Sequence, residues 1–147
     1  MELALGQKGP VAPPPVLDHP YQIAAKTVAG WDDVIAATHW HLFRRGEVDG
    51  ADFYVNEREL GHIHLDGRVH LASNHFLGKA LRQNGLAQPF PFAGYEHWVC
   101  FEIGSTDEAA HAIWLFRLNY LRLRGMAEQD LLEEIRQAHT SMANQPE

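Results

Sequence analysis

Residues 59–67 predict a strand that ends in a tight turn. His62 and His64 lie two positions apart in this strand, so their side chains point to the same face of the sheet. Asp66 and Gly67 are the residue types preferred at the centre of a two-residue hairpin turn. The chain must therefore fold back on itself here, which predicts an antiparallel pair of strands with two histidines on one surface.

The same turn predicts the pairing of the two strands. A two-residue turn would pair Ile63 with His70 and place His70 on the face opposite to His62 and His64. This register disfavours a site that combines these three histidines. The prediction depends on the length of the turn, because a slip of one residue moves every side chain to the other face.

Strands and helices alternate along the rest of the chain. Apolar periodicity predicts strands at 37–43, 53–55 and 98–103, and helices at 18–30, 74–85, 105–125 and from 127 onward. The third helix begins with a capping box, because Ser105 is followed three residues later by Glu108. Hairpin-joined strands with helices between and after them predict an α+β fold, a mainly antiparallel sheet of about four to five strands packed against helices.

The length of 147 residues fits one domain with a core of its own. Residues 1–16 hold four of the eight prolines and predict a mobile tail, which leaves a single α+β domain at 17–142. The tail lacks the basic start and apolar segment of a secretory signal, and no run approaches the roughly 18 apolar residues of a membrane helix. We therefore expect a soluble, cytoplasmic protein without a membrane partner.

Composition argues against several functions. Twelve basic and nineteen acidic side chains give a formal charge of -7, which is the wrong sign for binding phosphates by charge, so we expect no nucleic-acid partner. The single cysteine, Cys100, excludes an internal disulfide. It has no basic neighbour in sequence, which favours a buried small hydrophobic side chain over a reactive thiol. Nucleophile-elbow, phosphate-loop and dinucleotide motifs are absent from the sequence.

Three segments together resemble a known family. They are the run Glu59-Leu60-Gly61-His62-Ile63-His64, the pair Trp98-Val99, and the helix that ends in Leu115-Phe116-Arg117-Leu118-Asn119-Tyr120. Together with neighbouring positions between roughly 22 and 123, they resemble the bacterial and fungal family labelled "luciferase domain". That family has no established activity, so the resemblance implies a protein of unknown function. Its label implies light emission, but the sequence has no flavin or nucleotide fingerprint.

The paired histidines suggest a metal site. His62 and His64 are the predicted ligands, with a third from His39, His41 or Glu59 on a neighbouring strand. Two imidazoles and one further ligand suit zinc or iron and leave a position open for water or substrate. In the alternative, these histidines only form hydrogen bonds within the sheet face or face solvent.

Two hypotheses for the function follow. In the first, a small-molecule ligand binds a histidine-lined pocket with aromatic walls such as Phe53, Trp40 or Trp98, and Glu59 or His97 acts as acid or base. In the second, the domain is a non-catalytic protein-interaction or regulatory module, such as a homodimer, with structural histidines. A bound metal would favour the first hypothesis, and an exposed aromatic patch with dispersed histidines would favour the second.

Overall fold

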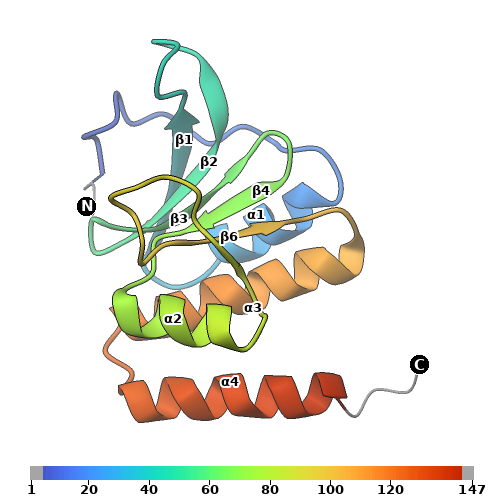
Figure 1. The fold of residues 1–147 in the computed structure, drawn as a ribbon. Helices are drawn as coiled ribbons and strands as arrows, with labels where there is room; N and C mark the ends of the chain where they lie inside the picture. Colours follow the sequence, from blue (N-terminus) through green and yellow to red (C-terminus); the bar gives the residue numbers. More distant parts are fainter. Residues whose placement is uncertain (1–4, 144–147) are drawn as a thin grey trace.

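The computed structural model describes residues 5–143 and contains one antiparallel sheet with the strand order β1-β2-β3-β4-β6-β5 (Figure 1). The strands are β1 (Val34–Trp40), β2 (Val48–Val55), β3 (Arg58–His64), β4 (Arg68–Leu71), β5 (Gln88–Pro89) and β6 (Val99–Glu102). The predicted α+β class is confirmed. The sheet has one strand more than expected, because two residues of the proline-rich connection pair with β6 as β5.

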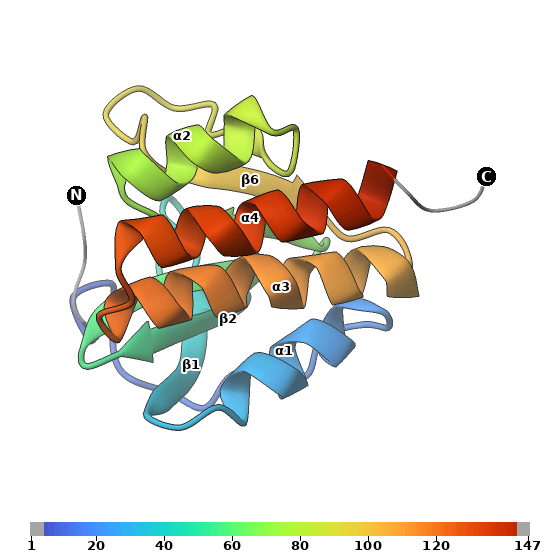
Figure 2. The same ribbon diagram turned by 90° about the horizontal axis from the view of Figure 1, so that it is seen from below.

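The helices of the described chain are α1 (Tyr21–Ala29), α2 (His75–Gln83), α3 (Thr106–Leu123) and α4 (Glu128–Ala143). They lie on one side of the sheet. Helix α3 packs directly against β3 and β4, α1 lies beside α3, and α4 forms the outermost layer across α2 and α3 (Figure 2). No helix within residues 5–143 is long and apolar enough to cross a membrane.

Helices α2 and α3 begin at predicted caps, whereas α1 begins at Tyr21 rather than at 18 and has no side-chain cap. The hydroxyl of Ser105 accepts the backbone N–H of Glu108, and the Glu108 carboxylate accepts the N–H of Gly104, so the capping box fixes the start of α3. The side chain of Asn74 caps α2 in the same way by accepting the N–H of Leu77. These local contacts place α3 so that its apolar side faces the sheet.

The core fills the space between the sheet and the helices. Phe116 of α3 is fully buried and packs edge-on against Phe53 of β2, with ring centroids 5.6 Å apart. Ile63 and Val69, which pair across β3 and β4, lie in the same core. Phe53 was expected to line a pocket beside the histidines. That expectation is wrong, because Phe53 points to the helix side of the sheet.

A β-bulge interrupts the alternation of side chains in β3. Phe53 pairs with Gly61 but Tyr54 pairs with Glu59, so Leu60 is an extra residue between them. The bulge brings Glu59 to the same face as His62, three positions later. Gly61 has φ 153°, and a Cβ there would meet the carbonyl oxygen of His70 at 2.7 Å, so this position requires glycine.

The hairpin between β3 and β4 differs from its prediction by one residue. Ile63 pairs with Val69 and His62 with His70, which leaves residues 65–67 as a three-residue loop. Gly67 takes the left-handed conformation that such loops use, with φ 89°. The predicted two-residue turn was therefore wrong, and so was its consequence. His70 lies on the same face of the sheet as His62.

Residues 5–16, predicted as part of a mobile tail, lie across the sheet face that the helices leave uncovered (Figure 1). Thr38 donates its backbone N–H and its hydroxyl to carbonyl oxygens of this segment, and the indole N–H of Trp40 donates to a third. Trp40 therefore packs against the N-terminal segment. Residues 1–4 of the predicted tail lie outside the described residues.

Candidate functional site: a buried cluster of histidines and carboxylates

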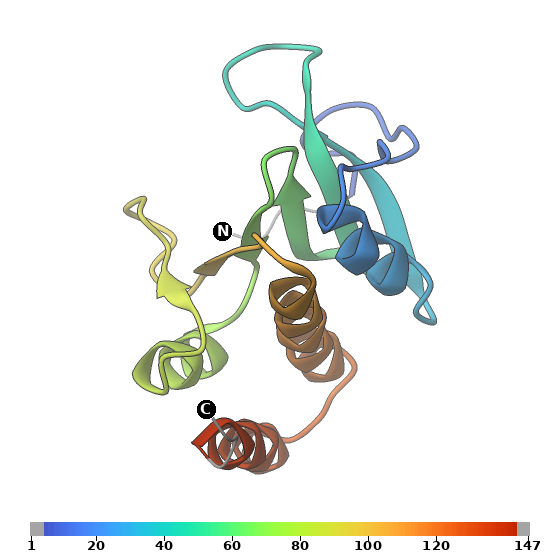
Figure 3. The same ribbon diagram turned by 90° about the vertical axis from the view of Figure 1, so that its right-hand side faces the viewer.

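The sheet face opposite the helices gathers titratable side chains from four adjacent strands. We call them the histidine–carboxylate cluster; its members are His39 of β1, Asp49 and Asp52 of β2, Glu59, His62 and His64 of β3, and His70 of β4. The N-terminal segment and residues 89–97, which precede β6, lie at opposite flanks of this face (Figure 3). The cluster is therefore enclosed between the sheet and two connecting segments.

Burial of this cluster is costly. Asp52 and Glu59 have no exposed surface, and all four histidines are buried. Taking charged or strongly polar groups out of water costs several kcal/mol each unless partners compensate for it. The contacts within the cluster must therefore account for each buried group.

Three histidines each direct the same ring nitrogen at a carboxylate. The three contacts are His39 Nδ1 to Asp52 Oδ2 at 3.2 Å, His62 Nδ1 to Glu59 Oε2 at 3.0 Å, and His64 Nδ1 to Asp49 Oδ2 at 2.9 Å. A neutral imidazole that donates through Nδ1 keeps its lone pair on Nε2. Carboxylates in this position orient metal-ligating histidines in many proteins. The three rings can thus have the tautomer that a metal ligand needs.

His70 connects two of these rings. Its Nδ1 lies 3.0 Å from Nε2 of His62 and 3.1 Å from Nε2 of His64. When all three rings are neutral and the other two donate to carboxylates, His70 has one N–H to offer to two lone pairs. One Nε2 lone pair is then left without a proton. A cation bound there would use it.

His62, His64 and His70 are held in their neutral form. Burial lowers the pKa of His70 to about 3, and burial together with the nearby His39 ring keeps the pKa of His62 well below its usual range. Burial also lowers the pKa of His64, although Asp49 acts in the opposite direction. Neutral imidazole is the form that binds metal ions.

Two subsets of the cluster have the spacing of metal ligands. One ring nitrogen from each of His39, His62 and His64 lies within 4.8 Å of the others, and so do ligand atoms of Asp52, Glu59 and His62. Tetrahedral zinc with bonds of about 2.0–2.1 Å holds its ligand atoms about 3.3 Å apart. The rings of His39 and His62 are stacked with their centroids 3.8 Å apart, so they would have to rotate relative to each other to bind one ion.

Lys8 supplies a positive charge to the carboxylates. Its Nζ lies 2.9 Å from Asp52 Oδ2 and 2.5 Å from Glu59 Oε2. Burial alone would lower the pKa of Lys8, but the charges of Glu59 and Asp52 outweigh it and raise the pKa above its usual value. Burial and the charge on Glu59 raise the pKa of Asp52. The two carboxylates therefore share one buried ammonium.

Some predicted site residues meet in this cluster and others do not. His39, His62, His64 and Glu59 lie together. His41 lies beyond the end of β1, where its Nδ1 accepts two backbone N–H groups of the following turn, and it does not enter the cluster.

Of the two predicted residues that directly precede β6, Trp98 lies at the cluster and His97 has another role. The Trp98 ring reaches the cluster, with its centroid 6.1 Å from that of His62. His97 is held through its backbone, since its carbonyl oxygen accepts the hydroxyl of Ser73. Of this pair, Trp98 forms the aromatic wall beside the histidines.

Three members of the cluster, Asp49, Asp52 and His70, and the neighbouring Lys8 were not predicted from the sequence. Asp52 lies directly opposite His62, but this follows only once the pairing of β2 with β3 is known, and Asp49, three positions before Asp52, does not fit simple alternation. Lys8 likewise had no signal in the sequence, because 51 positions separate it from Glu59 and it lies in a proline-rich segment.

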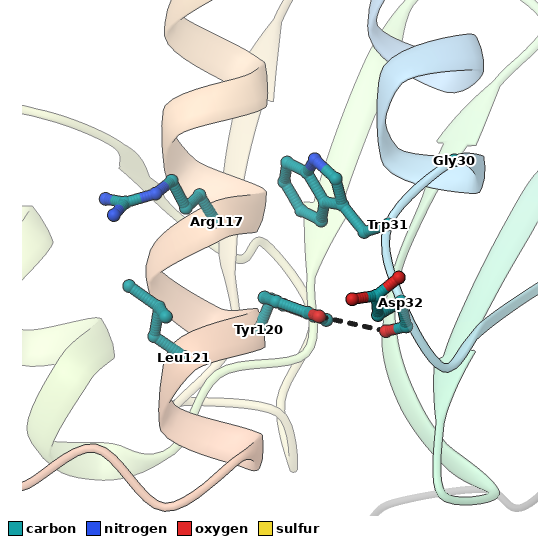
Figure 4. A pocket seen from close by; sticks show the side chains of 6 residues that line it. All are labelled: Gly30, Trp31, Asp32, Arg117, Tyr120 and Leu121. Atoms are coloured by element: carbon teal, nitrogen blue, oxygen red, sulfur yellow. Dashed lines mark hydrogen bonds between the residues drawn. The ribbon is translucent and has the colours of Figure 1, made fainter.

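A small cavity opens beside the cluster. It has a volume of about 200 Å³ and is lined by Arg68, His70, Cys100 and neighbouring residues of β5 and β6. A larger hollow of about 340 Å³ lies between the end of α1 and α3, where the Tyr120 hydroxyl donates to the carbonyl oxygen of Asp32 (Figure 4). Neither this hollow nor a third one of about 410 Å³, lined by His75, Lys79, Arg82 and Gln83, contains a cluster residue, whereas the cavity of about 200 Å³ contains His70.

Residues 57–119 match the family model described as Luciferase domain, which confirms the resemblance expected from the Glu59–His64 run. The matched segment runs from the start of β3 into α3 and contains four members of the cluster: Glu59, His62, His64 and His70. His39, Asp49 and Asp52 precede it. No curated protein and no solved structure matches the chain.

Proposed function

We propose that this chain, whose residues 57–119 match the Luciferase domain model, binds one divalent zinc or iron ion through His39, His62 and His64 and a small molecule beside it. The observation that supports the proposal most strongly is the carboxylate behind each of the three rings. This arrangement fixes the Nδ1 proton and leaves Nε2 as the ligand atom.

The donor set fits such an ion. Three imidazoles suit zinc and iron and leave a coordination position open, where the ion would polarise a bound water or substrate. Side chains around the ion would position its ligands. Glu59 orients His62 and Asp49 orients His64 through hydrogen bonds to Nδ1.

The cavity beside His70 supports the small-molecule part of the proposal. Its volume of about 200 Å³ is below the usual range of drug-sized ligand pockets, so it would admit only a small ligand. Its lining holds one guanidinium, that of Arg68, which pairs with Asp66, and one carboxylate, that of Glu102. Both anionic and cationic small molecules are therefore to be screened.

The interaction-module hypothesis is less well supported. It predicts dispersed histidines that serve the fold one at a time, whereas four buried histidines are in mutual contact across three strands. Grouping them offers no packing advantage over apolar side chains and costs desolvation energy. Binding of a metal ion would explain why the chain retains this costly arrangement.

The test is elemental analysis of protein purified without a chelator or a histidine tag. We expect about one metal ion per chain in the wild type and a loss of most of it in the variant His62→Ala plus His64→Ala. The matched control is His41→Ala plus His75→Ala, which also removes two histidines but neither of them from the cluster.

A spectroscopic measurement supplements the metal content. Cobalt(II) loaded into the metal-free protein should give the visible absorption of a four-coordinate site in the wild type and control but not in the His62→Ala plus His64→Ala variant. Protein that retains no stoichiometric metal after reloading with zinc, iron and manganese would contradict the proposal. The chain of hydrogen bonds from Glu59 through His62 to His70 would then favour metal-free acid–base chemistry.

A further inference from the structure

The contact between Lys8 and the two buried carboxylates is a separate feature of the cluster. Asp52 and Glu59 come from neighbouring strands, and neither has any exposed surface. One ammonium group, that of Lys8, lies between them and contacts one oxygen of each. The Lys8 ammonium thus occupies a position at which the two carboxylates could bind a divalent ion.

The other oxygen of each carboxylate points to an incomplete site. Asp52 Oδ1 and Glu59 Oε1 are both buried and have no hydrogen-bond partner among the residues that the structure describes. A buried acceptor without a partner costs about 1–3 kcal/mol, and more when the group is charged. A divalent cation bound through both oxygens of each carboxylate would satisfy the unused oxygens together with those that Lys8 now contacts.

The lysine arrives from outside the sheet. Lys8 belongs to the segment 5–16, which is attached to β1 by a few hydrogen bonds through Thr38 and Trp40 and to the β2–β3 turn through Leu5. No strand pairing holds this segment among the described elements. Its attachment can therefore be released without disturbing the sheet that carries the carboxylates.

We infer that Asp52, Glu59 and His62 form a second cation site, and that the Lys8 ammonium occupies it as an internal cation that a divalent metal ion can replace. The three side chains present ligand atoms within 4.8 Å of one another. Carboxylate oxygens with one imidazole suit manganese(II) better than an all-imidazole set does. His62 belongs to both groups and would serve one ion at a time, so the inference does not require the three-histidine site to be filled.

The test compares manganese(II) binding by Lys8→Met and Lys8→Arg, measured from the free Mn²⁺ signal in electron paramagnetic resonance. The methionine keeps an unbranched apolar stem and removes the ammonium group, while the arginine keeps a competing cation. We expect Lys8→Met to bind about one Mn²⁺ more than Lys8→Arg, or to bind it roughly tenfold more tightly. Adding Asp52→Asn and Glu59→Gln to Lys8→Met should abolish the gain.

A second variant separates this site from the three-histidine site. His39→Ala plus His64→Ala in the Lys8→Met background removes two members of the first group and leaves Asp52, Glu59 and His62. Persistence of the additional Mn²⁺ supports the second site even if the zinc or iron proposal fails. Its disappearance overturns the second site and assigns the ion to the histidines.

Measuring the stability of Lys8→Met with and without Mn²⁺ shows whether the variant merely fails to fold. Lys8→Met leaves two buried carboxylates without their countercharge, so the variant should be destabilised without metal and regain stability when Mn²⁺ is added. A variant that folds only with Mn²⁺ supports the inference. Equal Mn²⁺ binding by Lys8→Met and Lys8→Arg, or a Lys8→Met protein that Mn²⁺ does not restore, overturns it.

Discussion

The two faces of the central sheet differ completely in chemistry, although alternate residues of the same strands form them. On the helix side of β2, Ala51, Phe53 and Val55 are buried in an apolar core. On the other side, Asp52 and Tyr54 are equally buried, and the Tyr54 hydroxyl donates to Asp52. One face therefore gains stability from burial, whereas the other must offset the cost of burying polar groups.

This difference indicates where function is concentrated. An apolar face can be explained by stability alone, because burial of each large side chain contributes about 1.5–3 kcal/mol. A buried face of histidines and carboxylates is not the most stable choice for a fold, since well-packed apolar residues often replace such groups without loss. Its presence favours a functional site, and it implies that substitutions on the two faces have different consequences.

The largest expected effect is on the apolar face. Phe116→Ala removes a fully buried ring that packs against Phe53, and should lower the free energy of unfolding by about 3–5 kcal/mol. Urea denaturation would measure this change. The metal content of the folded fraction should stay at the wild-type level, because no cluster residue contacts this ring. A parallel loss of metal would break the distinction between the faces.

Gly61→Ala should affect both faces, because Gly61 lies in the bulge that aligns Glu59 with His62. A Cβ at this position would meet backbone of β4 and the Phe116 ring, and φ 153° disfavours any residue with a side chain. We expect a loss of roughly 2–4 kcal/mol in stability together with weaker metal binding. Gly46→Ala is the control, because Gly46 also has a positive φ of 78° but open space around it, so this change adds backbone strain without the contacts. Metal binding that survives Gly61→Ala would show that the bulge does not set the ligand geometry.

A smaller effect is expected for Asp49, the carboxylate that contacts the predicted metal ligand His64. Asp49→Asn keeps the size of the side chain but weakens its hold on His64 Nδ1, and should reduce metal affinity by about 10–100-fold. Competition with a chromophoric chelator measures this affinity. Asp66→Asn, in the exposed turn where Asp66 pairs with Arg68, is the matched control and should leave it unchanged. Equal affinities for the two variants would argue against a ligand-orienting role for Asp49.

The sequence predicted the parts of the molecule that depend on local contacts. The capping box of Ser105 and Glu108, the cap at Asn74 and the antiparallel hairpins all involve residues a few positions apart, and all are present. The register of β3 and β4 failed, because Asp66 and Gly67 suit either a two-residue turn or a three-residue loop with Gly67 in its left-handed position. That one-residue difference determined the face on which His70 lies.

The candidate site was predicted only in part for the same reason. His62 and His64 are neighbours by strand periodicity, so the sequence could pair them. Lys8 and Asp52 reach the site through contacts between distant segments, which leave no periodic pattern. The β3 bulge, which places Glu59 on the histidine face, depends on how β3 pairs with β2 and likewise lay beyond the sequence pattern.

The smallest expected effect concerns the thiol of Cys100, which lies on β6 beside the histidine face. Cys100 pairs with His70 across β4 and β6 and lines the cavity of about 200 Å³. Burial raises the pKa of its thiol to about 11, so the protonated thiol is the native form up to that pH. An unfolded cysteine ionises at about pH 8.5. Any contribution of the neutral thiol to stability is thus present at neutral pH and is lost as the pH rises toward 11.

Reaction with iodoacetamide measures this difference directly. At pH 8 Cys100 should be alkylated roughly 100-fold more slowly than free cysteine, and the rate should rise with pH until about 11, because only the thiolate reacts. Protein unfolded in urea should react at the rate of free cysteine. Rapid alkylation of the folded protein at pH 8 would instead reveal a low pKa for the thiol. Cys100 would then count among the reactive groups of the histidine face. That face would have to include β6 as well as β1 to β4.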